Sequence, residues 1–167
     1  MKLNNIEFNA NDFANEMAKL RNEKHFDFLV TIVGEDFGEE GFGCIYILEN
    51  TQTYERISVK VVASDRENPF LPSVTGLWKA ADLLEREVYD FFGIKFIGHP
   101  DMRRLYLRSD FIGYPLRKDY DMDPEKNRPN MYDDPEPDYT LQYSLDKDGN
   151  LVETRHKLFG DDDYVVN

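Results

Sequence analysis

The chain has 167 residues, of which 41% are hydrophobic and 14% aromatic, so it can bury a core as one domain of ordinary size. A formal charge of −13 at pH 7 argues against general nucleic-acid binding, which requires a basic surface. Cys44 is the single cysteine, which excludes an internal disulfide and a cysteine cluster for zinc or an iron–sulfur centre.

The N-terminal part predicts a helix followed by a strand and a loop. Asn9 or Asn11 can cap the helix. Its apolar residues recur on one face at helical spacing: Phe13, Met17 and Leu20. The run at 26–33 is rich in β-branched and aromatic residues and predicts a strand. We expect a loop at 34–41, whose glycines lack phosphate-binding spacing and whose acids would repel a phosphate.

Two further strands are predicted at 43–48 and 56–63, joined by a hairpin connection at 50–53. The second has the alternation of a half-buried strand, with one set of apolar residues on one face: Ile57, Val59 and Val61. Cys44 is interpreted as a small core residue, because no histidine at a recognisable spacing supports a nucleophilic role.

A second helix is predicted after the proline-containing break at 68–72. Ser73 or Thr75 can cap it, and Gly93 stands where a left-handed C-terminal cap is expected. Its apolar stripe comprises residues at helical spacing: Leu77, Ala80 or Ala81, Leu84, Val88, and Phe91 or Phe92.

The charged residues of this helix allow two interpretations. Arg86 lies four residues from both Asp82 and Asp90 and can pair with either. A run such as Glu85-Arg86-Glu87 is usually a solvated helix surface, and its alternative is a functional motif. Glu85 and Glu87 point about 200° apart on a helix, which makes them poor partners for acid–base catalysis.

The helix is followed by a short extended piece at 94–96 and a turn at His99. Pro100 holds the backbone of His99 out of the helical region, and no second ligand lies beside the imidazole at a metal-binding spacing. We expect a hydrogen-bonded structural histidine. Arg103 and Arg104 are adjacent, so in an extended strand one can be buried in an ion pair while the other faces a partner. Glu87 and Asp90 are the expected acidic partners of these arginines.

The C-terminal part changes character. Residues 120–138 show little periodicity, which predicts an extended, partner-dependent segment. They contain four prolines: Pro124, Pro129, Pro135 and Pro137. A late hairpin is predicted from 139–145 and 151–156 around a turn at 146–150.

Charge and hydropathy place the chain outside the membrane. Residues 99–118 carry five basic side chains against two acidic ones, whereas 119–167 carry fourteen acidic against five basic. Such a basic island indicates a specific acidic partner or internal pairing. No apolar run approaches the roughly 18 residues of a membrane-spanning helix, and residues 1–5 lack a signal or transit pattern. We therefore expect a cytoplasmic location.

The central stretch resembles the signature of the thirty-kilodalton subunit, or C subunit, of proton-pumping NADH:quinone oxidoreductase, respiratory complex I. That signature reads E-R-E-x-x-D-[LMF]-[FY]-G-I-x-F-x-G-H-P-D-L-R-R, and it matches residues 85–104 except for Met102, where leucine is common. A downstream G-x-P-L-R-K-D element matches 113–119. Residues 72–75 and Trp78 also match, so the resemblance covers about 25–120. Asp121 departs from the family, which often has proline there.

The resemblance implies an α+β domain over 1–120, with a mixed β-sheet, helices packed against it, and an extended acidic C-terminal tail over 121–167. It implies a peripheral-arm subunit, on the cytoplasmic side of the bacterial membrane, that docks on the large forty-nine-kilodalton subunit, or D subunit. No catalytic, cofactor or metal residue is expected in this chain, while FMN and iron–sulfur clusters belong to partner subunits. The motif is then an assembly surface made of Glu85, Arg86, Glu87, Asp90, Gly93, Gly98, His99, Pro100, Asp101, Arg103, Arg104, Gly113, Pro115, Arg117, Lys118 and Asp119.

Three alternatives stay open. Residues 163–167 resemble the chain leading into the D subunit, so the sequence is either a separate subunit or the C part of a C/D fusion. Membrane-bound group 4 hydrogenases and formate hydrogenlyase contain a homologous subunit with the same signature. A stand-alone enzyme using the neighbourhood of Glu87, Asp90 and His99 is the third and least favoured interpretation.

Overall fold

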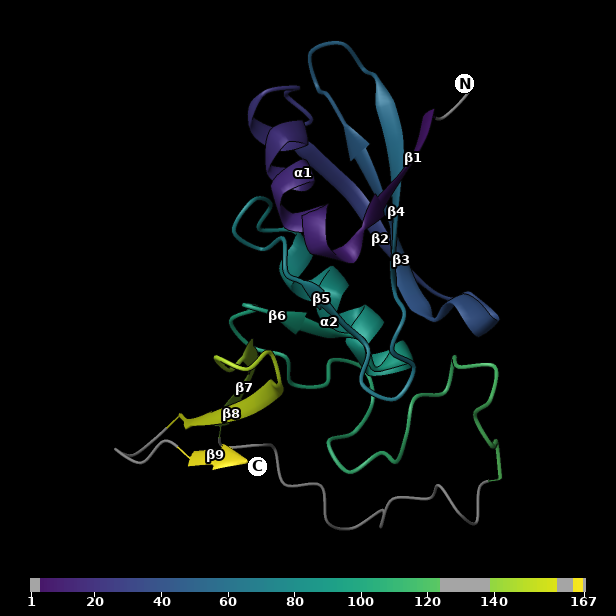
Figure 1. Ribbon diagram of the computed structural model, residues 1–167, viewed down its shortest axis with the longest axis vertical. Helices are drawn as coiled ribbons and strands as arrows, with labels where there is room; N and C mark the ends of the chain where they lie inside the picture. Colours follow the sequence, from purple (N-terminus) through teal and green to yellow (C-terminus); the bar gives the residue numbers. More distant parts are fainter. Residues whose placement is uncertain (1–3, 124–138, 159–163, 167) are drawn as a thin grey trace.

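The computed structural model describes residues 4–123, 139–158 and 164–166, and Figure 1 shows their arrangement. These parts of the chain form an α+β fold, as the sequence predicts. Their elements follow one another in the order β1 (Asn4–Asn9), α1 (Ala10–Asn22), β2 (Phe28–Asp36), the 3-10 turn η1 (Gly38–Glu40), β3 (Phe42–Glu49), β4 (Arg56–Ala63), β5 (Phe70–Pro72), α2 (Ala81–Phe92), β6 (Lys95–Ile97), β7 (Tyr139–Leu145), β8 (Leu151–Lys157) and β9 (Tyr164–Val166).

The main sheet is mixed and has the strand order β1-β4-β3-β2, with β1 parallel to β4 and the other neighbours antiparallel. The apolar stripe of α1 packs on it, and the fully buried Phe13 ring lies 5.1 Å from the Tyr46 ring in β3. Helix α2 approaches β2 at Gly34, where a Cβ atom would lie 2.6 Å from the Phe92 ring. A glycine therefore permits the close contact between this helix and the sheet.

The predicted strands and hairpin of the main sheet are confirmed, with two corrections. The loop expected at 34–41 is wrong for 34–36, which extend β2 and pair with β3 as far as Phe42. Strand β1 was not predicted, because its sequence NNIEFN is mostly polar and its burial alternates only weakly. Its place in the sheet depends on parallel pairing with β4, more than fifty residues away.

The predicted start of the second helix is wrong. Helix α2 begins at Ala81, and residues 73–80 form turns instead of helix. The Ser73 hydroxyl does not cap α2: its oxygen accepts the Thr75 backbone N–H at 3.2 Å, and its proton is donated to the Glu85 carboxylate. The end is as predicted: Gly93 adopts φ 73° and ψ 19°, the left-handed C-cap conformation.

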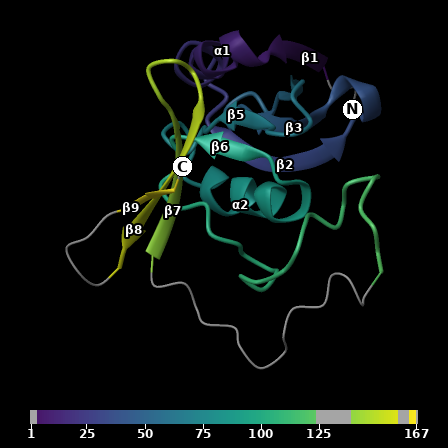
Figure 2. The same ribbon diagram turned by 60° about the horizontal axis from the view of Figure 1, so that its bottom comes forward.

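Two small sheets complete the fold. Strands β5 and β6 pair in parallel, and β7, β8 and β9 form an antiparallel sheet that lies beside β6 in Figure 2. The predicted late hairpin is confirmed as β7 and β8, and Leu141 and Tyr143 belong to the core. The four prolines predicted to keep the chain extended lie at 124–138, outside the described residues. None of the described helices is long and apolar enough to cross a membrane.

Candidate functional site

Glu85 ties α2 to the turn that precedes it. Its side chain is fully buried, and its two oxygens accept hydrogen bonds of 2.7 Å from the Val74 backbone N–H and the Ser73 hydroxyl. Burial without a counter-charge raises the pKa of the Glu85 carboxyl to about 8. The solvated-surface interpretation is therefore wrong for Glu85, because residues 73–80 fold back over it.

Asp90 gathers the loop that follows the His99 turn. One carboxylate oxygen accepts three consecutive backbone N–H groups, from Leu105 (3.1 Å), Tyr106 (2.7 Å) and Leu107 (2.9 Å). The other accepts a hydrogen bond of 3.0 Å from Arg104, within a buried ion pair. Asp90 itself is fully buried, so this charge is compensated entirely by the loop that it organises.

Arg104 extends this network to the next turn of the loop. Its guanidinium donates to the backbone carbonyls of Phe111 (3.1 Å) and Gly113 (2.9 Å) and also lies over the Tyr114 ring. The expected pairing of a motif arginine with Asp90 is thus confirmed. Glu87, the other expected acidic partner, has no ion pair among the residues that the structure describes.

Arg86 does not pair with Asp82 or Asp90, contrary to the prediction. Its guanidinium donates instead to the carbonyls of Arg103 (2.9 Å) and Arg104 (3.0 Å). The predicted strand at these two arginines is wrong as well. The segment has no regular structure, and its backbone carbonyls accept hydrogen bonds from the Arg86 side chain and not from a neighbouring strand.

His99 is buried and hydrogen-bonded, as expected. Its Nε2 atom lies 3.1 Å from the Asp82 carbonyl oxygen, and its Nδ1 atom accepts the Asp101 backbone N–H at 3.0 Å. With Nδ1 accepting, Nε2 carries the proton and donates to α2. Burial lowers the pKa of His99, which favours this neutral form. Gly98 precedes it with φ 83°, and Pro100 is exposed.

Three arginines of the basic island form ion pairs within the chain. Arg103 binds Asp101 at 2.7 Å, and Arg108 binds Asp110 at 3.0 Å. Of the two outcomes that the basic island left open, internal pairing is the one observed among the described residues. The arginines therefore shape the loop and do not form a free cationic surface.

The second motif element, 113–119, packs against the C-terminal end of α2. Arg117 lies between the rings of Phe42 (4.2 Å) and Tyr114 (4.7 Å) and donates to the Phe92 carbonyl at 2.7 Å. Pro115 is half-buried in the same turn.

Asp36, at the end of β2, holds the same element from the other side. It accepts the Lys118 backbone N–H at 3.0 Å and pairs with Arg66, which also reaches Asp119 at 3.3 Å. The hydrogen bond from Arg66 holds the pKa of Asp36 well below its usual range. Asp36 and Arg66 were missed in the sequence, because no local pattern links them to a loop that follows more than fifty residues later.

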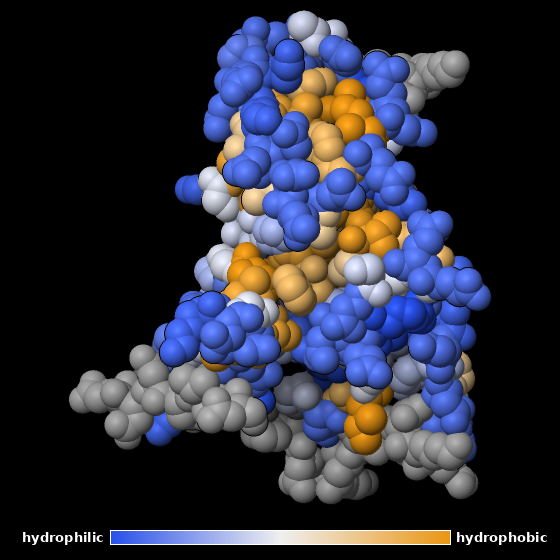
Figure 3. All heavy atoms as spheres, in the orientation of Figure 1, coloured by the Kyte–Doolittle hydropathy of each residue, from blue (hydrophilic) through white to orange (hydrophobic). Residues whose placement is uncertain are grey.

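The loop also leaves several large apolar side chains to solvent. Four large side chains are more than half exposed: Tyr106, Ile112, Leu116 and Met122. We call these residues the apolar loop surface. Figure 3 shows one face of the molecule, on which hydrophilic residues dominate and hydrophobic ones gather along the centre. In the described part of the chain no group of three or more His, Cys, Asp or Glu side chains could hold a metal ion.

The chain is thus an α+β domain in which the charged residues of the central motif, such as Asp90 and Arg104, bind the loop that follows α2 and β6. The family model for the 30 Kd subunit of the respiratory-chain NADH dehydrogenase matches residues 6–126, and the chain belongs to this family.

The relatives agree with this assignment. The C/D subunit of NADH-quinone oxidoreductase from Phocaeicola vulgatus is 51% identical over 163 residues, which are 97% of this chain and 31% of that protein. The C subunit from Moorella thermoacetica is 41% identical over 110 residues, 65% of this chain and 74% of that one. A chain in the solved structure of the membrane-bound sulfane sulfur reductase, an archaeal respiratory membrane complex, superimposes with a TM-score of 0.62 at 27% identity, covering 82% of this chain and 85% of its own. The chain thus spans about a third of the length of its C/D relatives.

Proposed function

We propose that this domain is a peripheral-arm subunit of a proton-translocating NADH:quinone oxidoreductase that docks on a large subunit of the D type. It carries no cofactor of its own and supports electron transfer from NADH to quinone by assembly, while FMN and iron–sulfur clusters reside in partner subunits. This chain then lies on the cytoplasmic side of the bacterial membrane, and it contacts the membrane only through the complex.

The apolar loop surface is the observation that carries the docking proposal. Exposed apolar patches on a soluble domain mark contacts with other proteins. Here the patch stands on a loop fixed by Asp90, Arg104 and Arg117, so little ordering entropy remains to be lost on binding. A loop held this firmly while it exposes apolar side chains suits a permanent interface.

A second candidate is the homologous subunit of a membrane-bound group 4 hydrogenase or formate hydrogenlyase. The likeness to a chain of the sulfane sulfur reductase complex supports it, because the same fold occurs there in a different respiratory membrane complex. The higher identities to the C and C/D subunits, 41% to 51%, favour the quinone oxidoreductase. Nickel-ligating cysteine pairs in the accompanying large subunit would decide for the hydrogenase.

The docking proposal is tested by placing Leu116→Asp in the chromosomal gene and separating the solubilised membrane complexes on native gels. We expect loss of the assembled complex and of NADH-dependent quinone reduction, because a charge would be buried at the interface. Leu83→Asp is the matched control, since Leu83 is 57% exposed on α2 and Leu116 is 54% exposed. Normal assembly of the Leu116→Asp complex would overturn the assigned surface.

A further inference from the structure

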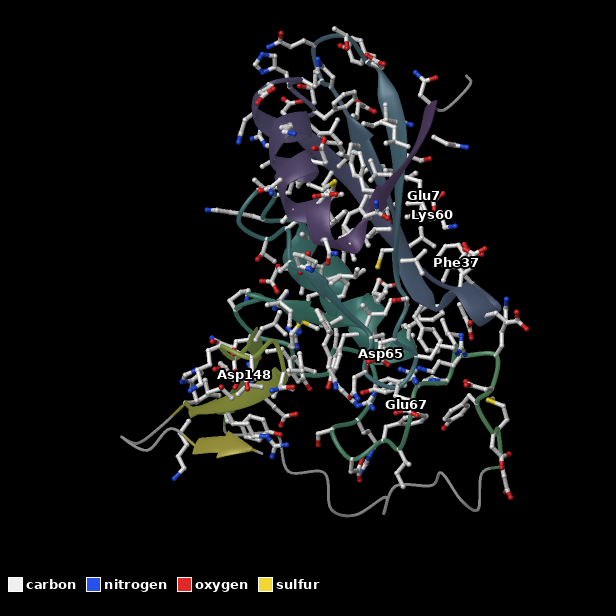
Figure 4. The ribbon with its side chains drawn as sticks, viewed as in Figure 1. Glu7, Phe37, Lys60, Asp65, Glu67 and Asp148 are labelled. Atoms are coloured by element: carbon white, nitrogen blue, oxygen red, sulfur yellow. The ribbon has the colours of Figure 1, made fainter. Side chains whose placement is uncertain are left out.

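The late hairpin is joined to the rest of the described fold by the segment 124–138, yet it packs as part of the core. The family match ends at residue 126, so the hairpin lies outside it. Figure 4 labels Asp148, which marks the turn of this hairpin at some distance from the main sheet. Strand β7 contacts β6 and residues 98–102, which joins the hairpin to the rest of the domain.

Three hydrogen bonds join the backbone of β7 to residues 98–102. The Met102 N–H donates to the Leu141 carbonyl, and the Gly98 N–H donates to the Tyr143 carbonyl at 3.2 Å. The Leu141 N–H returns a hydrogen bond of 3.2 Å to Asp101 Oδ1. One edge of β7 pairs with β8, and its other edge adds to 98–102. Residues 98–102 form a turn and not a strand, so they hold the extended β7 through these hydrogen bonds, a contact of the kind by which proteins bind extended peptides.

Side chains add a pattern to this backbone contact. Leu141 and Tyr143, two residues apart, are 7% and 5% exposed, whereas Gln142 between them reaches the Pro100 carbonyl at 2.9 Å. The Tyr143 ring lies 6.1 Å from the Tyr89 ring of α2, and its hydroxyl donates to Glu153 at 3.2 Å. Alternate side chains of a strand point to the same face, so a site that binds a strand selects apolar residues two positions apart.

The contact does not extend across a broad face. A cavity of about 200 Å³ is lined by residues of both the hairpin and the domain, among them Tyr89, Arg104, Tyr139 and Glu153. Strand β7 is the part of the hairpin that contacts β6, so a short extended peptide carries the groups that such a site requires.

We propose that residues 98–102, with Tyr89, form a strand-acceptor site for an extended segment of the pattern Leu-x-Tyr, and that β7 fills it within the same chain. Asp101 links this site to the following loop. Its Oδ1 atom accepts the Leu141 N–H and also accepts hydrogen bonds from Arg103. A partner strand of this pattern would have to displace β7.

The test uses the full chain with a specific protease site inserted in 124–138. After cleavage, we expect the fragment that carries β7 to co-elute with the N-terminal fragment on size-exclusion chromatography, at the mass of one chain. Separation of the two fragments without any substitution would overturn the proposal. Fragments held together at twice that mass would show that β7 of a second copy fills the site, which contradicts occupation within one chain.

A pair of variants in β7 tests the pattern. Leu141→Asp should release the fragment, whereas Leu145→Asp should not, because Leu145 is 42% exposed on the same strand. Binding should weaken at least about tenfold, the effect of losing one buried leucine. Release should speed hydrogen exchange at Gly98 and Met102, while the Leu105–Leu107 amides bound by Asp90 report whether the domain stays folded. Retention of the Leu141→Asp fragment would refute the assigned specificity.

Discussion

Two buried carboxyl groups on one helix meet opposite electrostatic environments. Asp90 faces a guanidinium and three backbone N–H groups, which stabilise its charge. Glu85 receives one backbone N–H and one hydroxyl and has no cation beside it. Asp90 therefore anchors the loop through charge-assisted hydrogen bonds. Glu85 is a hydrogen-bonding group whose neutral, protonated form is favoured by burial.

Replacing Asp90 by Ala should destabilise the domain strongly. The change leaves Arg104 and three N–H groups without their acceptor inside the protein, and breaking one side of a buried ion pair typically costs ~3–5 kcal/mol. Urea unfolding followed by circular dichroism gives this free energy. Asp110→Ala is the control, because Asp110 pairs with Arg108 in partial contact with solvent and should matter little. Equal effects of the two substitutions would contradict the anchoring role of Asp90.

Glu85 should make the stability of the domain fall as pH rises. Its pKa is about 8 in the fold against an ordinary 4.5, so its contribution is complete below pH 4.5 and disappears as pH approaches 8. Each unit of pKa difference corresponds to ~1.4 kcal/mol, so the change amounts to a few kcal/mol.

The measurement for Glu85 is the free energy of unfolding at pH 5.5 and 8.5, in the natural chain and in Glu85→Gln. The neutral amide keeps an oxygen to accept the Val74 N–H and offers an NH2 group that the Ser73 hydroxyl can accept, so it should remove this part of the pH dependence. Comparing the two proteins cancels His99, whose lowered pKa makes stability rise with pH. Identical pH profiles would show that Glu85 is ionised in the fold.

At the scale of elements, Gly93 is where α2 and the element 113–119 meet. Gly93→Ala should destabilise by more than ~1–2 kcal/mol, because φ of 73° disfavours a side chain and the new Cβ would lie 2.5 Å from the Tyr114 ring. Gly76→Ala is the matched control: its Cβ would meet open space, and its φ is not in the left-handed region. Thermal unfolding of both variants decides, and similar melting temperatures would refute the expected clash.

Elements defined by local sequence were predictable, whereas those defined by distant contacts were not. The alternation in β4, the hairpin turn before it and the glycine cap of α2 each follow from neighbouring residues. The start of α2 does not, because Glu85 captures the residues that could have capped a helix. The same holds for the site: Asp90 was predicted to bind an arginine, but its three amide contacts come from a loop without regular structure.

At the scale of the whole molecule, a net charge of −13 and a basic island suggest an electrostatic interface, but the described contacts favour an apolar one. The island is largely neutralised internally, by Asp101, Asp90 and Asp110. Charged pairs also lie on the main sheet, where Lys60 of β4 joins Glu7 and Glu40 and lies over the Phe37 ring. Figure 4 labels Glu7, Lys60 and Phe37, which lie close together there. The proposed docking face differs from both, because its exposed side chains carry no charge.

This difference predicts a complex that resists salt. Raising NaCl from 0.1 to 1 M shortens the Debye length from ~10 Å to ~3 Å and weakens exposed ion pairs, while apolar contacts persist. We therefore expect this chain to stay in the detergent-solubilised complex through a 1 M NaCl wash, measured as its ratio to the large subunit. Arg103→Ala should lower that ratio at both salt concentrations, because the arginine acts through the shape of the loop and not through a contact with the partner. Release of the natural chain by salt alone would instead assign docking to charges, and the apolar loop surface would then need another partner.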